Sequence, residues 1–414
     1  MLKSTNNKIA FAHLTSRLKQ TMVATLSVTF GISMYIFMNG FMNGINNVQA
    51  DLSFSTLAHI RVYNDVPEDH TNLLKKSAGP DQVINLRNAK VIQYTEGIKN
   101  SAEIMRKVSM SPQVTDFTPQ VNINVFYRSG AIKINGTLSG IEVENENRLF
   151  HTGNFVIQGS WNELNYRTDG AIIGVGLARK MSLKVDDNLV VTTADGITKS
   201  FKIIGIFKTT IAGVDNVKAY VRIGTARQLI SENQNYVTDI QVNIKNYNEA
   251  RKVAAELALS IPYKVEAWQT ANGQLEASTQ LRNILAIAVS LTILIVAGFG
   301  IYNIMNMTVN EKIREIAILK AMGFGGKDIV QIFLTQSIVI GVIGGLVGVV
   351  FGYLISSVVN HIPFQIATLQ ILPMTYYPAD YLLAFVFGLI TTFIAGYLPA
   401  KKASTIDPVT IIRG

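Results

Sequence analysis

Two glycine-containing segments have residue types that bind nucleotides, so their spacing decides whether they form such sites. Residues 174–178 (GVGLA) lie between a predicted strand and a predicted helix, as the phosphate-binding turn of a dinucleotide fold does. The third glycine of that motif is missing, and no acidic residue ends a plausible second strand. This run therefore predicts a tight turn.

The second segment, 323–328 (GFGGKD), contains glycines and a lysine, as a phosphate loop does. The GxxxxGK[ST] spacing is not met, and Asp328 stands where that loop needs the hydroxyl that binds Mg²⁺. The sequence thus predicts no nucleotide site in this chain.

Metal ligands and nucleophiles are also without a suitable arrangement. The chain has no cysteine, and its five histidines, at 13, 59, 70, 151 and 361, are dispersed without ligand spacing. No nucleophile elbow or other hydrolase motif is present. Asp and Glu are nearly absent from the apolar stretches, which argues against an ion-coupled carrier. We expect a non-catalytic chain with no metal site and no cofactor of its own.

The strongest functional signal is the segment 311–323, which lies between two apolar stretches. Its composition predicts a helix that ends at Gly323, a natural C-cap residue. One face of the predicted helix is formed by Ile313, Ile316, Ala317 and Lys320. Such a helix is suited to docking into a groove of another protein, or to lying on lipid headgroups, and composition leaves both open.

Four windows without a charged residue surround these motifs, at 20–50, 283–310, 329–379 and 381–400. A bilayer core needs ~20 apolar residues per helix, so each window can hold a span. The predicted transmembrane helices are 21–50, 283–309, 329–359 and 380–399. Residues 1–20 predict a short amphipathic helix before the first span. A cleaved signal peptide fits less well, because its apolar region is only ~7–15 residues long.

The basic surplus indicates orientation. The formal charge is +9, yet residues 51–280 carry 25 Lys and Arg against 23 Asp and Glu. The surplus flanks the spans, within 3–19, 312–327 and 401–413, whereas 360–379 has no Lys or Arg. By the positive-inside rule, both termini and the second connection are cytoplasmic, and the polar block 51–280 lies outside. We therefore expect no nucleic-acid partner.

The polar block predicts an α+β domain. Strands are predicted at 58–63, 103–110, 121–127, 133–140, 171–173, 189–193, 201–207, 219–223, 237–244 and 263–267, and helices at 82–97, 176–181 and 248–259. The strand–helix–strand end resembles the beginning, so residues 51–135 and 235–280 are predicted to enclose an inserted β-rich subdomain, 136–234.

Span three contains small residues four positions apart, which let helix backbones approach closely in lipid. The two overlapping rows are Gly341 and Gly345, and Gly344, Gly348 and Gly352. Static packing and a contact that slides during a cycle both remain open.

Two motifs resemble a known family. Residues 311–323 resemble the coupling segment of the MacB/FtsX-like (type VII) ABC transporter permeases, and residues 397–409 (YLPAKKASTIDPV) resemble their C-terminal motif. One span, an external domain and three further spans is the topology of that family. The resemblance implies a multi-pass protein of the cell inner membrane, with a periplasmic domain of Porter and Sabre type.

The resemblance also implies partners. These are a cytoplasmic ABC ATPase dimer, which would bind ATP and Mg²⁺, and a second permease copy or a paralogue. The residues that would couple the chain to the ATPase are Glu311, Lys312, Arg314, Glu315, Ile316, Lys320 and Gly323.

Within the family, the strongest resemblance is to the lipoprotein-releasing (Lol) permeases, through segments such as 37–41 (FMNGF) and 57–62 (LAHIRV). It implies extraction of lipoproteins from the inner membrane, with transfer to a periplasmic carrier. The hairpin that recruits the carrier is replaced by a tight turn at 194–199, which leaves direct docking of a carrier open.

Candidate residues for an acyl-chain wall are Met34, Phe37, Met38, Phe41, Met42, Leu281, Leu285 and Ile287. Met and Phe adapt to variable apolar ligands, although each residue could equally face lipid or another helix. Two other functions remain open. They are a MacB-like mechanotransmission efflux permease, whose ATPase is usually fused, and an FtsX-like regulator of a cell-wall hydrolase, whose external domain is usually smaller.

Overall fold

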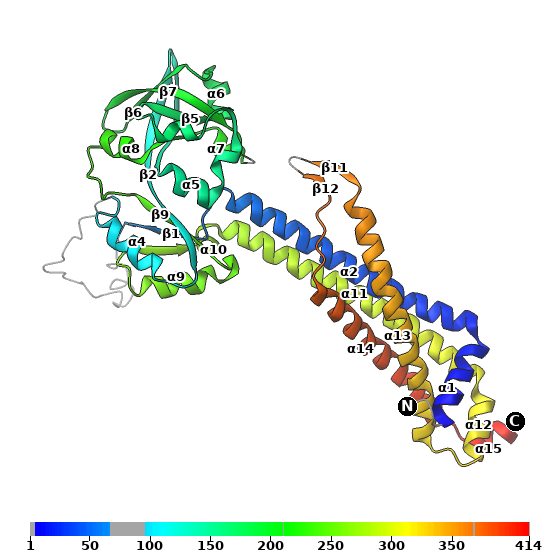
Figure 1. Cartoon of the computed structure of the whole chain (residues 1–414). Coiled ribbons are helices and arrows are strands. Elements are labelled where there is room, and N and C mark those ends of the chain that lie inside the picture. The colour runs from blue at the N-terminus through cyan, green and yellow to red at the C-terminus, as the bar shows by residue number, and fades with distance from the viewer. Residues whose placement is uncertain (1–4, 67–95, 210, 367–368, 414) are drawn as a thin grey trace, which may run out of the picture. The chain divides into compact units, whose positions relative to one another are not determined.

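The computed structural model describes residues 5–66, 96–209, 211–366 and 369–413 (Figure 1). They divide into two compact units. The helical unit is Met1–Ala50 with Ala277–Gly414, and the α+β unit is Asp51–Glu276.

Four long helices form most of the helical unit. They are α2 (Leu18–Phe54), α11 (Gly273–Glu311), α13 (Gly326–Asn360) and α14 (Pro378–Ser404). Each is long and apolar enough to cross a membrane, which confirms the four predicted spans. The shorter elements are α1 (Thr5–Ser16), α12 (Ile313–Ala321), α15 (Pro408–Arg413) and the pair β11 (Pro363–Ile366) and β12 (Leu369–Ile371).

One glycine row brings α13 into close contact with α2. A Cβ added to these glycines would lie 2.8–3.0 Å from the Cβ atoms of a β-branched row on α2. The pairs are Gly344 with Val28, Gly348 with Ile32, and Gly352 with Ile36. The Thr29 hydroxyl also donates to the carbonyl of Gly344 across this contact, at 3.2 Å. Because these glycines have no side chain, the side chains of α2 contact the backbone of α13 directly.

The second row faces a different helix, α14. A Cβ on Gly341 would lie 2.4 Å from Thr392 Oγ1, and one on Gly345 would lie 2.8 Å from the ring of Phe385. The two overlapping rows therefore fix α13 between α2 and α14.

The first part of the α+β unit is an antiparallel sheet of order β10-β1-β9-β2. Its strands are β1 (Ile60–Tyr63), β9 (Asp239–Ile244), β10 (Lys264–Ala267) and the beginning of β2 (Val114–Ser129). The helices α4 (Ser101–Ser109) and α9 (Ala250–Ala258) pack their apolar residues into the core of this part.

The second part is a closed six-stranded barrel of order β2-β3-β8-β5-β7-β6, in which β6 returns to pair with β2. The other strands are β3 (Ile132–Ile141), β5 (Gly170–Gly174), β6 (Asn188–Thr193), β7 (Thr198–Phe207) and β8 (Lys218–Arg222), with β4 (Val156–Gly159) added to β7. Its core is a single apolar cluster that includes Tyr127, Leu138 and Phe201. The surrounding helices are α5 (Val143–Phe150), α6 (Val175–Met181), α7 (Ala212–Asp215) and α8 (Ile223–Leu229), whereas α10 (Trp268–Ala271) belongs to the core of the first part.

Strand β2 belongs to both parts. Its residues 114–120 pair with β9, and its residues 125–128 pair with β6. The change of partner at 121–124 comes before the predicted boundary at residue 136, which falls inside β3. The reason is that β2 is one continuous strand of 16 residues that passes from the sheet into the barrel.

Most predicted strands of the α+β unit are present, but 103–110 is wrong. This segment is helix α4, in which Ile104 and Val108, one turn apart, are buried. The predicted helix 82–97 lies almost entirely outside the described residues. The tight turn predicted at 194–199 is confirmed, since residues 194–197 join β6 to β7 and Gly196 has a φ of +84°.

We predict that Gly348→Leu destabilises the helical unit by about 2–3 kcal/mol, because the new side chain would overlap the Ile32 side chain on α2. The measurement is the midpoint of SDS-induced unfolding of the full chain. Val347→Leu, one residue away at a position 37% exposed, is the matched control and should leave the midpoint unchanged. Equal midpoints for the two variants would contradict the close packing.

Candidate functional site

Helix α12 is a separate element between α11 and α13. The backbone of Lys312 leaves helical geometry with φ −94° and ψ 12°, which separates α12 from α11. At the other end, the N–H of Phe324 donates to the carbonyl of Leu319, and that of Gly323 donates to Lys320, each at 3.1 Å. With a φ of +100° at Gly323, this is a Schellman C-cap and confirms the predicted helix end.

The inward face of α12 belongs to the core of the helical unit. Ile316 is 1% exposed and lies in an apolar cluster with residues of α1, α2, α11, α13 and α14, and Ala317 is 0% exposed. Lys320 Nζ donates to the carbonyls of Ser404 and Ile406, at 2.9 and 2.6 Å. Of the predicted coupling residues, Ile316 and Lys320 therefore hold α12 in place and do not present their side-chain ends to a partner.

Helix α1 holds α12 from another side through His13. The Gln336 amide N–H donates to His13 Nδ1 at 2.9 Å, so the ring proton lies on Nε2, which is 3.4 Å from a carboxylate oxygen of Glu315. The His13 ring also packs near Phe333, with centroids 6.2 Å apart. Burial, and then the nearby Lys312 ammonium, lower the pKa of His13, while Glu315 acts in the opposite direction. His13 is therefore a neutral bridge between α12 and α13.

The Glu311 carboxylate, at the end of α11, forms a second link, which runs to the start of α2. Arg17 Nη1 lies 3.0 Å from a Glu311 carboxylate oxygen, and the Gln20 amide donates to both oxygens at 3.0 and 3.1 Å. Lys312 pairs with Glu315 at 2.6 Å within the coupling segment. The bonds of Glu311 connect the end of α11, immediately before α12, to the start of the helix that makes the first span.

The outward face of α12 presents Arg314, Ile318 and Met322, spaced one turn apart. Arg314 is exposed, Ile318 is 52% exposed and Met322 is 64% exposed. Glu311, Glu315 and Gly323 are also exposed, so four of the seven predicted coupling residues are exposed, while Lys312 is half-buried. Sequence reasoning missed Ile318 and Met322, although their spacing of four, opposite Ile316, was the available signal.

The two segments that imitate nucleotide sites have structural roles. Asp328 accepts the Gly325 N–H at 2.9 Å and caps the start of α13, and it also accepts from the Asn6 amide of α1 at 3.1 Å. A Cβ on Gly174 would lie 2.2 Å from the carbonyl of Asp215, so this position is filled by α7 backbone.

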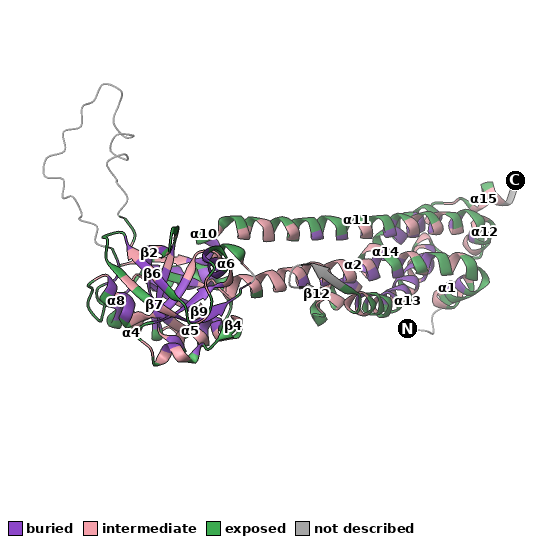
Figure 2. Cartoon of the chain, turned by 90° about the horizontal axis from the view of Figure 1, so that it is seen from above, coloured by how far each residue is buried: buried purple, intermediate pink, exposed green. Residues whose placement is uncertain are grey.

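The candidate acyl-chain residues occupy partly open surfaces of two neighbouring helices. Met34, Phe37, Met38, Phe41 and Met42 of α2 are all half-buried. The rings of Phe37 and Phe41 stack, with centroids 6.1 Å apart and planes 3° from parallel. On α11, Leu281, Leu285 and Ile287 are 50–67% exposed, in a helix that is open along much of its length (Figure 2).

Asparagines that sequence reasoning did not single out position this part of α2. The Asn46 side chain donates to Asn283 at 2.8 Å and accepts from Arg282 at 3.0 Å, both on α11. Asn43 donates to Asp380 at 3.0 Å. The spacing of these asparagines within an apolar stretch was the signal that could have identified them.

Two family models match the chain. A model of the FtsX-like permease C-terminal region matches residues 287–408, and one of the MacB-like periplasmic core domain matches residues 21–259, more than half of the chain. The chain belongs to the MacB/FtsX-like ABC transporter permeases. Its α+β unit is the family's periplasmic core domain, and its four long helices are membrane spans.

Individual relatives lie at low identity. This permease is 25% identical to the pyoverdine export ATP-binding/permease protein PvdT of Pseudomonas fluorescens over 346 residues, 76% of this chain and 48% of that protein, so it spans about half of the relative's length. It is 22% identical to the lipoprotein-releasing system transmembrane protein LolE of Haemophilus influenzae, over 74% of this chain and 79% of LolE. The solved periplasmic region of MacB from Actinobacillus actinomycetemcomitans matches at 13% identity and a TM-score of 0.34, over 54% of this chain and 94% of that one.

We predict that acidification loosens α1 from the permease. The pKa of His13 is lowered when α1 is docked, so His13 binds a proton more readily when α1 is undocked. Docking is therefore fully stable above about pH 6.5, the ordinary pKa of histidine, and weakens below it. Amide hydrogen exchange of Thr5–Ser16 should therefore speed up as the pH falls through 6.5 toward 5, after correction for intrinsic rates. His13→Gln keeps a donor and an acceptor without titrating and should abolish this pH dependence. The same pH response in His13→Gln would contradict the assignment.

Proposed function

We propose that this permease extracts lipoproteins from the outer leaflet of the inner membrane for transfer toward the outer membrane, driven by a separate ATPase dimer. The observation that carries the proposal is the match to LolE, which covers 74% of this chain and 79% of that relative. The half-open wall of Met and Phe side chains on α2 supports it, because such side chains adapt to acyl chains of different shape.

The ATPase dimer docks on the outward face of α12, through Arg314, Ile318 and Met322 together with the exposed carboxylates Glu311 and Glu315. Apolar side chains flanked by charge suit a groove on a partner protein. Lipid headgroups are the alternative neighbour of this face. The docking account is supported by the rigid attachment of the opposite face of α12 to α1, α13 and α14.

Movement of α12 on ATP binding is passed to α2 and α11. The polar links at His13 and Glu311 and the glycine contacts of α13 leave little room for α12 to move alone. Two permease copies, or a copy and a paralogue, then close the space between their α2 and α11 helices and expel the acyl chains. In this orientation both ends of the chain and α12 are cytoplasmic, and the α+β unit is periplasmic.

A MacB-like efflux permease is the second candidate. The match to the pyoverdine exporter favours it, over 76% of this chain. In that case the α+β unit would transmit force to other periplasmic partners, and lipid-anchored proteins would not enter between α2 and α11.

A photo-crosslinking amino acid at Met38 distinguishes the two candidates. We predict that it crosslinks to the acyl chains of lipidated proteins in membranes with the partner ATPase, and that ATP added before irradiation reduces the amount of this adduct. The same label at Ile343, 48% exposed on α13, is the control and should label only bulk lipid. Labelling of bulk lipid alone at both positions would count against lipoprotein extraction.

A further inference from the structure

Strand β2 has an open edge where it passes from the sheet into the barrel. On this edge the first residue of β9, Asp239, pairs with Gln120, and the last residue of β6, Thr193, pairs with Val125. Within the described residues, 121–124 have no strand partner on this side, although β3 pairs with them on the other side. Both flanking strands run antiparallel to β2, so the gap interrupts one line of strands.

Backbone polar groups face this gap. The N–H of Thr238 donates to the Gln120 carbonyl at 2.9 Å, and the N–H of Asn122 donates to the Thr238 hydroxyl at 2.8 Å, so even-numbered residues turn their backbone toward the gap. In β3, the residue opposite Asn124 is Thr137. The N–H of Thr137 donates to the carbonyl of Val217 at 2.9 Å, on the side away from β2. The N–H of Asn124 therefore points into the gap, with no strand partner among the described residues, whereas its carbonyl faces Ala194, where the pairing of β2 with β6 begins.

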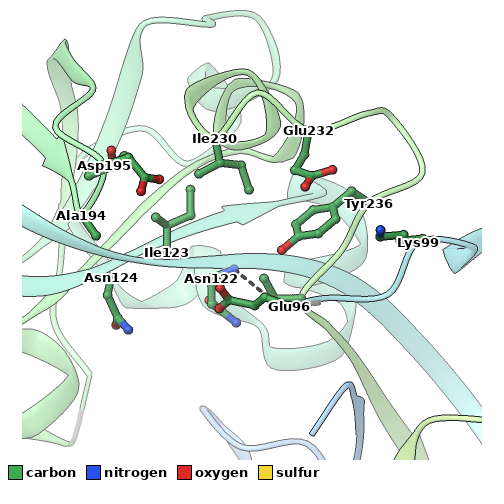
Figure 3. Close-up of a pocket in the computed structure, with 12 residues that line it drawn as sticks. Glu96, Lys99, Asn122, Ile123, Asn124, Ala194, Asp195, Ile230, Glu232 and Tyr236 are labelled. Atoms are coloured by element: carbon green, nitrogen blue, oxygen red, sulfur yellow. Dashed lines mark hydrogen bonds between the residues drawn. The ribbon is translucent and has the colours of Figure 1, made fainter. Parts of the chain in front are cut away.

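A cavity of about 460 Å³ lies at the gap (Figure 3). On one side of the strand, Ile123, Ile230 and Tyr236 form an apolar group, and Asn122 and Asn124 lie on the other side. Apolar and amide side chains therefore alternate along this part of β2, a pattern that can recognise the alternate side chains of an extended peptide.

The rim of the cavity is acidic. Three carboxylates line it, from Glu96, Asp195 and Glu232, against one ammonium, from Lys99. All four residues are exposed at the surface of the α+β unit. The rim therefore favours a ligand with positive charge.

We propose that this gap binds an extended, basic segment of a partner polypeptide, which adds as a strand antiparallel to β2 at residues 121–124. The N–H of Asn124 donates to the added strand, and the acidic rim selects lysine or arginine side chains. The binding depends on the α+β unit alone, so it holds whether the permease moves lipoproteins or another substrate.

The test uses the full chain in uncharged detergent and a fluorescein-labelled octapeptide of alternating Lys and Thr. Two comparison peptides carry either Glu in place of each Lys, or N-methyl groups on alternate backbone amides with the charge unchanged. We expect the Lys–Thr peptide to bind about tenfold or more tightly than either comparison peptide. Binding should also slow hydrogen exchange of the Asn124 amide.

The variant Asp195→Lys with Glu232→Lys should weaken binding by about tenfold or more. The control is Glu144→Lys with Glu256→Lys, which makes the same change of charge at exposed positions outside the cavity and should bind as the parent chain does. Equal binding of the basic and N-methylated peptides, or no change of exchange at Asn124, would overturn strand addition. Equal loss in both double variants would overturn the role of the rim.

Discussion

In a bilayer, helices gain little from hydrophobic burial against one another, so the helical unit depends on how closely α13 approaches its neighbours. Gly344, Gly348 and Gly352 let the β-branched row of α2 rest on the backbone of α13. A second row, from Gly341 and Gly345, does the same for α14. Because neither contact leaves room for a Cβ atom on these glycines, α2, α13 and α14 have little freedom to shift separately.

The short helices α1 and α12 are attached to this packed group by polar bonds. Asn6 binds Asp328 at the start of α13, His13 bridges Gln336 and Glu315, and Lys320 binds the carbonyls after α14. Each is a bond between elements far apart in the sequence. Together they make α12 the outward end of a connected body, which is what transmission of force from a partner requires.

Sequence patterns with a clear physical cause were predicted well. Uncharged windows identified the four spans, glycine at 323 identified the end of α12, and rows of small residues identified the faces of α13. The predictions that failed depended on tertiary contacts. Helix α4 was taken for a strand because its short apolar pattern fits both periods, and only packing against the sheet distinguishes them. The subdomain boundary predicted at residue 136 was misplaced because one strand, β2, belongs to both the sheet and the barrel. The inward position of Ile316 was not predicted because it depends on residues from five other helices.

The central claim is that α12 and α2 move as one body when the ATPase closes. The chain has no cysteine, so spin labels can be attached at Ala321→Cys on α12 and Leu26→Cys on α2, both exposed. Pulsed EPR would measure the distance between these labels within one copy, and the distance between Leu26→Cys labels in two copies, in the complete transporter before and after ATP is trapped. The account predicts that the first distance stays constant while the second shortens. A change in the first distance with the second constant would contradict it.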